Sequence, residues 1–217
     1  MADDLKYGYK GAEPTQSFGN NTGVFDPNDI NNLIADNKWT TFGQLELIET
    51  QTVSGVTQAD FTNIKEDIYN VHFLIITNYQ NSTNADDVII QLFESGTIET
   101  GNVYENAYQE ASSSNRFNEY RSISDNNLLS LSSSGNSASR NGNGYMYLYN
   151  AGNSSLYTHA TFHSIGDYTT ILGHALSYFG GGVLPQTSTV DGIRIKSLYY
   201  TNTSSFTASL YGIREHS

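Results

Sequence analysis

The chain has 217 residues, no cysteine, and 10 Lys and Arg against 22 Asp and Glu, which gives a formal net charge of −12 at pH 7. The missing thiols exclude disulfides, thiolate metal sites and a cysteine nucleophile, and the scattered basic residues argue against nucleic-acid binding. No apolar run is long enough to span a bilayer, so we expect no membrane insertion. The length suits one large domain, or one domain with an added arm.

Residues 1–44 show no sustained period of 2 or of 3.6 residues, and we predict an extended N-terminal arm there. One short helix is expected near 29–35, where Asp26-Pro27 or Asn28 can start it. Two readings of the arm remain open: a flexible tail, or a segment that docks on a neighbouring subunit because it cannot form its own core. In the second reading the partner-docking residues are Phe18, Val24, Phe25, Leu33 and Trp39.

Residues 45–217 carry the alternation of a β domain. The runs 44–53 and 56–62 are predicted as strands. The run 69–77 is apolar on both parities, which is typical of a strand in the middle of a packed structure. A polar turn separates it from the run 86–94, and we expect these two runs to be antiparallel neighbours.

The middle of the chain is less regular. Residues 104–110 could form a strand, and residues 116–131 could form a helix or a loop that crosses a sheet edge. Short apolar runs then recur around 145–150, 155–165 and 178–184, bounded by Asn, Gly and Ser. Strands at such intervals, with such turns, favour a β-sandwich or jelly roll.

The last two runs also alternate, and we predict that they pair as a terminal hairpin. Ile193 and Ile195 share one parity, as do Phe206, Ala208 and Leu210, so these side chains are expected to point inward. The predicted fold is therefore all-β: an antiparallel, jelly-roll-like β-sandwich over residues 45–217, preceded by the arm over residues 1–44.

The best metal candidate is the pair His159 and His163, with Asp167 and His174 nearby in sequence. Thr161 lies between the two histidines on the same strand face, and no known ligand spacing is completed. The alternative is two exposed strand histidines, which we prefer. We expect no metal and no cofactor.

Catalytic patterns are also weak. A glycosidase needs two carboxylates that flank a sugar bond, but the neighbours Asp86 and Asp87 would point to opposite faces of a strand; Glu94 is a further candidate acid. Nucleophilic hydrolysis would need a G-x-S-x-G elbow, which the sequence lacks. We therefore expect no enzyme activity.

The tyrosines carry a stronger pattern. Tyr145, Tyr147 and Tyr149 share one strand parity, and Tyr157 follows in the next run. We prefer a partly buried cross-strand ladder. The alternative is a shallow ligand platform that stacks on sugar rings or on a partner protein, because Tyr offers apolar area with a polar tip.

Several phrases of the sequence resemble a β-sandwich module of virion proteins from tailed phages, especially phages of marine cyanobacteria. The opening phrases L-I-x-x-Q-T, F-T-x-I and Y-x-V are carried by Leu47, Ile48, Gln51, Thr52, Phe61, Thr62, Ile64, Tyr69 and Val71, with His72 where an aromatic residue is more usual. The closing pattern is carried by Ile193, Ile195, Phe206, Leu210, Tyr211, Gly212 and Ile213. The segment 17–33 and the N-K-W of residues 37–39 are similar to the leading segments of such proteins.

This resemblance implies a structural role without catalysis. We expect a virion protein, made in the cytoplasm of a bacterial host, that decorates the capsid and is anchored by its arm. The alternatives are a tail or fibre-associated adhesin that binds carbohydrate, and a glycan-cleaving enzyme on a β scaffold. The expected partners are capsid or tail subunits and further copies of the chain, with a host-surface glycan as another possible partner.

Overall fold

The structure is a computed structural model that describes residues 27–35, 45–82, 86–134, 140–168, 174–199 and 203–214. Contacts divide the chain into two units, residues 1–43 and 44–217. In the first unit the described residues form α1 (Pro27–Ala35). This confirms the predicted short helix, which begins at Pro27 because the fixed φ of proline suits a first helical position.

Most of the proposed docking residues lie outside the part of the chain that the structure describes. Phe18, Val24, Phe25 and Trp39 lie outside the described residues. Leu33 lies in α1, but its side chain is outside the described part of the structure. The docking role of the arm therefore stays a prediction.

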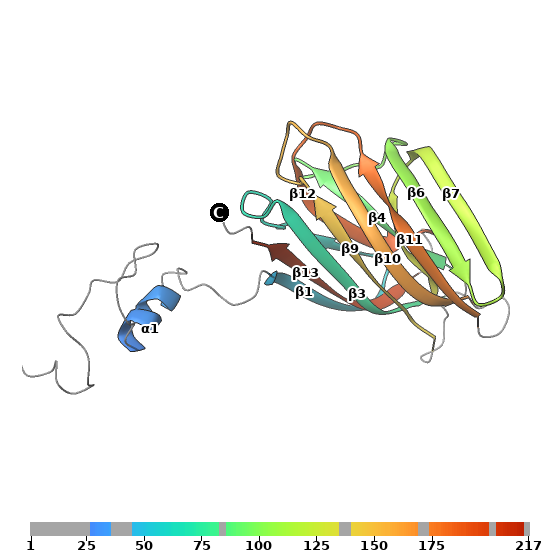
Figure 1. Ribbon diagram of the computed structural model, residues 1–217, viewed down its shortest axis with the longest axis horizontal. Coiled ribbons are helices and arrows are strands. Elements are labelled where there is room, and N and C mark those ends of the chain that lie inside the picture. The colour runs from blue at the N-terminus through green and yellow to red at the C-terminus, as the bar shows by residue number, and fades with distance from the viewer. Residues whose placement is uncertain are drawn as a thin grey trace, which may run out of the picture. The chain divides into compact units, whose positions relative to one another are not determined.

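The second unit is an antiparallel β-sandwich, as the alternation predicts (Figure 1). Its larger sheet, sheet A, has eight strands in the order β1-β13-β3-β9-β10-β11-β6-β7. In that order their bounds are Leu45–Val56, Ser204–Ile213, Val71–Asn81, Gly142–Tyr149, Thr158–Tyr168, His174–Leu184, Tyr104–Ser112 and Arg116–Asp125. The first and last strands of the chain are thus neighbours at one edge of sheet A.

The smaller sheet, sheet B, has five strands. Its order begins β2 (Gln58–Phe61), β12 (Val190–Ser197) and β4 (Asp86–Glu94). The far side of β4 is shared by two strands, since β5 (Thr97–Ile98) pairs with its end and β8 (Leu128–Ser134) with its beginning.

The core lies between the two sheets. Sheet A contributes alternate residues of its central strands, such as Leu74 on β3 and Leu148 on β9, and sheet B contributes Ile90 and Leu92 on β4; all four are at most 2% exposed. Each such side chain contributes roughly 1.5–3 kcal/mol on burial. The predicted inward residues are confirmed: Ile193, Ile195, Phe206, Ala208 and Leu210 are all buried.

Two predicted pairings are wrong. The runs 69–77 and 86–94 belong to β3 in sheet A and β4 in sheet B, and the two terminal runs likewise form β12 in sheet B and β13 in sheet A. Alternation shows which side chains point inward, but both sheets of a sandwich obey the same rule. It therefore does not show to which sheet a strand belongs.

Asp86 lies where two connections between the sheets come together: the connection from β3 to β4 and the connection from β12 to β13. Its side chain accepts hydrogen bonds from the Ser197 hydroxyl and, at 3.4 Å, from the Tyr199 backbone N–H. Its carbonyl accepts one from the Asn81 side-chain amide at 2.8 Å. Asp86 thus contacts the starts of both connections, the first through its backbone carbonyl and the second through its buried carboxylate.

The segment 116–131 holds β7 and the start of β8, and no helix. β7 pairs with β6 through a tight turn in which Asn115 has a positive φ of 64°. Asn tolerates this left-handed conformation well, so the polar run before Arg116 forms a hairpin turn.

Candidate functional site

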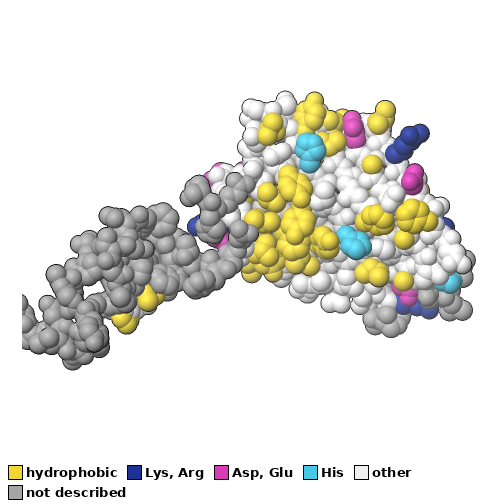
Figure 2. All heavy atoms as spheres, in the orientation of Figure 1, with side chains coloured by type: hydrophobic (Ala, Val, Ile, Leu, Met, Phe, Trp, Pro, Cys, Tyr) yellow, Lys and Arg dark blue, Asp and Glu magenta, His cyan; other side chains and the backbone are white. Residues whose placement is uncertain are grey.

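The outer face of sheet A carries an unusual concentration of aromatic side chains. The view in Figure 2 shows hydrophobic side chains gathered over β13, β3 and β9. We call this surface the aromatic face; its members are Leu47, Phe73, Ile75, Tyr145, Tyr147, Tyr149, His163, Phe179 and Tyr211. The side chains between them on the same strands point inward to the core, so the strands hold these residues on one surface.

The register of the strands brings the aromatic face together. In one row, Tyr211 on β13 lies opposite Phe73 on β3, which lies opposite Tyr147 on β9. In the next row, Tyr145 on β9 lies opposite His163 on β10, and His163 lies opposite Phe179 on β11. Such directly opposed pairs are close enough for ring contacts.

Ring contacts connect the two rows. The Phe73 and Tyr147 rings stack with centroids 4.6 Å apart and planes 27° apart. Tyr145 makes an edge contact with Tyr147 at 6.0 Å and another with His163 at 6.0 Å. His163 in turn meets the Phe179 ring at 6.3 Å. The rings therefore form one continuous ridge across five strands, from β13 to β11.

The stacking also determines whether ring faces or ring edges point away from the sheet. Rings with centroids 4.6 Å apart on neighbouring strands must stand beside one another, because rings lying flat on the sheet would be further apart. Phe73 and Tyr147 therefore use one ring face each on the other, and they turn their edges outward. Tyr145, which is 41% exposed, is the most accessible tyrosine of the ridge.

A shallow depression lies beside the ridge, with a volume of about 310 Å³. The ridge residues Phe73, Tyr145 and His163 form part of its outer lining, and the rest comes from Ile75, Thr77, Asn143 and Ile165. Ile165 is 53% exposed, and the lining is almost wholly apolar. Ridge and depression together make an uneven apolar surface instead of a flat one.

The surrounding face carries no formal charge. Opposed outward residues form four successive rows across six strands, β1, β13, β3, β9, β10 and β11. None of the residues in these rows is Asp, Glu, Lys or Arg, although 15% of the chain is charged. Those residues are Leu45, Leu47, Thr50, Thr52, Thr207, Ser209, Tyr211, Ile213, Val71, Phe73, Ile75, Thr77, Asn143, Tyr145, Tyr147, Tyr149, His159, Thr161, His163, Ile165, Ser177, Phe179, Gly181 and Val183. Large exposed patches with aromatic side chains are typical of interaction surfaces.

The four predicted tyrosines do not all lie on this surface. The structure brings Tyr145, Tyr147 and Tyr149 together, while Tyr157 lies in the segment before β10, 46% exposed and outside the ring contacts of the ridge. Sequence reasoning missed Phe73 and Tyr211. A signal was present, because the run 69–77 is apolar on both parities, and its outward half supplies the aromatic face.

The aromatic face contains one Ser–His contact, between Ser177 and His163. The Ser177 hydroxyl donates its proton to the Ser164 carbonyl at 2.9 Å, so it can only accept the 3.1 Å hydrogen bond from His163 Nε2. A nucleophilic serine would instead donate to the histidine. The pair therefore orients the His163 ring and does not activate Ser177.

The geometry also argues against a shared metal at His159 and His163. They are four residues apart on one strand, which separates them by roughly 13 Å, whereas two ligands of one zinc ion each lie about 2 Å from it. His159 Nδ1 donates to the Tyr157 carbonyl at 3.0 Å. Among the described residues no cluster of three or more His, Asp or Glu could hold a metal ion.

One pair of carboxylates does interact directly. Burial raises the pKa of Glu94, and the neighbouring Glu99 raises it further, while the Ser188 hydroxyl that donates to Glu94 opposes the shift. The pKa of Glu99 is lowered, chiefly because the Gly101 backbone N–H donates to it at 2.6 Å. Glu94 ends β4 and Glu99 follows β5, and their side chains bond to Ser188, Gln186 and the Gly101 backbone.

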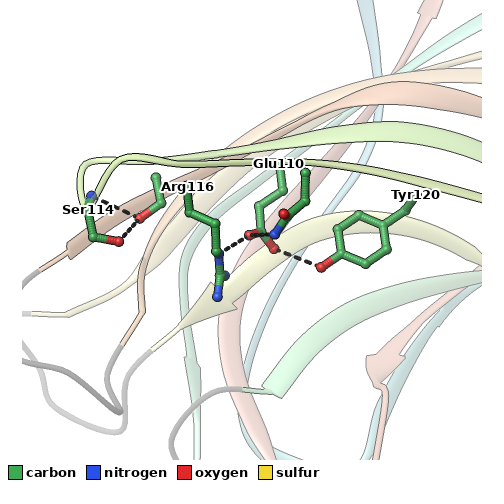
Figure 3. Close-up of polar contacts among 6 residues, drawn as sticks. Glu110, Ser114, Arg116 and Tyr120 are labelled. Atoms are coloured by element: carbon green, nitrogen blue, oxygen red, sulfur yellow. Dashed lines mark hydrogen bonds and ion pairs between the residues drawn. The ribbon is translucent and has the colours of Figure 1, made fainter.

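A second buried acid, Glu110 on β6, belongs to the β6–β7 hairpin (Figure 3). It is 2% exposed and meets Arg116 Nε at 2.5 Å. Asn118 and Tyr120 donate to its two oxygens at 3.0 and 3.5 Å. All these partners come from β7, so this cluster fastens the hairpin.

Comparison of the chain with family models, with curated proteins and with solved structures finds no match. No helix in the described ranges is long and apolar enough to cross a membrane.

Proposed function

We propose that the protein is a non-enzymatic structural protein of a phage virion, and that its body binds through the aromatic face. The aromatic face is the observation that carries the binding role, because an exposed, uncharged aromatic ridge costs solubility unless a partner covers it. The virion setting rests on the resemblance in residues 17–80 and 190–213.

Decoration of the capsid is the form of this role that we favour. In it, the arm of residues 1–44 anchors the protein to the particle through Phe18, Val24, Phe25, Leu33 and Trp39. The alternative location is the tail or a fibre, with capsid and tail subunits as the respective partners. Buried aromatic anchors supply most of the binding energy in such interfaces.

The contacts of the acidic residues support a role without catalysis. Asp86 and Glu110 are each held by structural hydrogen bonds, and the Glu94–Glu99 pair is directed to its own loops. A glycosidase would instead point two carboxylates into a sugar-sized cleft.

A second candidate, glycan binding by an adhesin, has one observation in its favour. Tyr145 is well exposed beside the apolar depression, where a sugar ring could lie. The stacking of Phe73 on Tyr147 weighs against it, because a sugar packs on a free ring face and these rings present edges.

Cryo-electron microscopy of intact virions tests the proposal, with the chain carrying a C-terminal tag for labelling. We expect the protein at regular positions on the capsid. A companion variant that lacks residues 1–44 should lose incorporation while the melting temperature of the body stays within a few degrees. Absence of the protein from purified virions would overturn the virion role, and full incorporation of the shortened chain would overturn anchoring by the arm.

A further inference from the structure

We infer that the partner of the aromatic face is the aromatic face of a second copy of this chain, in a two-fold symmetric dimer. The inference rests on the proposed use of this surface for binding, and it names the occupant. Charge, area, shape and ring orientation each bear on it.

The net charge of the chain and the lack of charge on the aromatic face limit which partner can bind there. Each copy carries a net charge of −12, so two copies repel unless they meet where carboxylates are absent. The uncharged rows over β1, β13, β3, β9, β10 and β11 form such a place. A basic partner would instead be matched by acidic residues, which this surface lacks.

The area fits a stable dimer. Six strands at about 4.8 Å spacing and four rows at about 6.8 Å cover roughly 780 Å². A specific interface of standard size covers about 800 Å² on each partner. The uncharged surface is therefore large enough for a dimer without help from the charged rim.

The shape of the aromatic face can complement itself, because it has a ridge and a depression side by side. The ridge around Phe73, Tyr145 and Tyr147 lies directly beside the depression lined by Ile75 and Ile165. In a two-fold interface the same patch serves both partners, so the ridge of one copy can enter the depression of the other. The outer faces of two sheets then pack as the inner faces of a sandwich do.

The orientation of the rings favours a second copy of the chain over a neutral glycan as the partner of the aromatic face. The rings of Phe73 and Tyr147 stand on edge and stack on each other, which leaves ridges that interdigitate with side chains. Sugar binding would favour rings that lie flat and free. The second copy is thus the occupant that the ridge fits better.

Sedimentation velocity on the purified full chain, over about 1–100 μM, tests the inference. We expect a dimer that dissociates on dilution. Tyr145→Asp and Leu47→Asp each place two new charges in the interface, one from each copy, and should raise the dissociation constant at least 100-fold. Ile123→Asp is the matched control: Ile123 is 82% exposed on β7, outside the aromatic face, and its replacement should leave dimerisation unchanged.

Because the chain has no cysteine, single cysteine substitutions give a second readout. Thr77→Cys, Thr161→Cys and Thr207→Cys sample the aromatic face, and under mild oxidation at least one should form a covalent dimer. Ile123→Cys should not. A covalent dimer from Ile123→Cys alone would place the interface elsewhere and overturn the inference.

The remaining outcomes distinguish the dimer from the proposed function. A wild-type chain that is monomeric at 100 μM overturns the dimer; if Tyr145→Asp also abolishes incorporation into particles, the face binds another virion subunit and the proposed function stands. A monomer that binds neutral glycans through Tyr145 overturns the dimer in favour of the adhesin. A dimer insensitive to Tyr145→Asp and Leu47→Asp also contradicts the inference.

Discussion

The ring of Tyr69 lies directly on Gly212: a Cβ added to Gly212 would be 2.2 Å from Tyr69 Cγ. Tyr69 precedes β3 and is 7% exposed, and its hydroxyl donates to Glu46 Oε2 at 2.6 Å. Glu46 also pairs with Arg214 Nε at 2.9 Å. A ring from one part of the chain and a bare backbone position near its end thus form one closely packed corner.

Replacing Gly212 should therefore destabilise the fold. Gly212→Ala forces Tyr69 away from β13, and we expect a loss of about 2–3 kcal/mol, measured by urea unfolding. A double-mutant cycle supplies the control: in a Tyr69→Ala background the same change should cost much less. Equal costs in both backgrounds would show that the ring contact is not the cause.

His72 should make the stability depend on pH. Its pKa is lowered by burial, against the opposing effect of the hydrogen bond from Nε2 to the Ile64 carbonyl at 2.8 Å. As the pH falls, His72 therefore takes up a proton more readily in the unfolded chain than in the folded chain. Stability is full above the unfolded pKa of about 6.5 and falls as the pH drops below it, by at most about 1.4 kcal/mol per pH unit.

The measurement is urea unfolding at several pH values between about 7.5 and 5.5. His72→Gln keeps a donor for the Ile64 carbonyl but does not titrate, so its stability should fall less steeply over this range. The slope is compared, and not the absolute stability, because the substitution also changes core packing. Identical slopes would exclude His72 as the titrating group.

Glu94→Gln should stabilise the protein at neutral pH. The raised pKa of Glu94 means that folding favours its protonated form, so its contribution is present at low pH and lost as the pH rises through the folded pKa. The amide of the replacement glutamine mimics the protonated acid and can still accept from Ser188. We expect a melting temperature about 1–2 °C higher at pH 7. The gain should vanish near pH 4; a gain of the same size there would point to another cause.

Glu110→Gln should weaken the β6–β7 hairpin. The substitution removes the charge that faces Arg116 and leaves one acceptor oxygen where Asn118 and Tyr120 each had one, so we expect a loss of about 1–2 kcal/mol. Hydrogen exchange should locate the loss in residues 104–125. Glu119→Gln on the same hairpin serves as the control, because Glu119 is exposed and accepts a long hydrogen bond from Gln109, at 3.4 Å; a similar loss there would contradict the role of Glu110.

The sequence predicts the strands and their inward faces well, because both depend on local alternation. Ile193, Phe206 and Leu210 are buried as their parity requires. It does not predict which sheet holds β4 or β12, because that choice depends on pairing between residues far apart in the sequence, such as Asp86 on β4 with Ser197 on β12.

The same limit applies to the aromatic face. The parity of Tyr145 and Tyr147 places them on one surface, but Phe73 and Tyr211 join them only through the pairing of β13, β3 and β9. Two residues far apart in the sequence, Tyr69 and Gly212, also meet only in the folded structure. Tyr69 packs on Gly212, which explains a glycine in a strand that otherwise alternates strictly.

The most direct test of the functional claim is incorporation of the Tyr145→Asp variant into virions, counted by quantitative mass spectrometry of purified particles. Tyr145 points outward, so the fold should persist, as an unchanged melting temperature would verify. If the aromatic face is the binding surface, the copy number of Tyr145→Asp should fall at least tenfold while that of Ile123→Asp equals wild type. Wild-type copy numbers for both variants would contradict the claim.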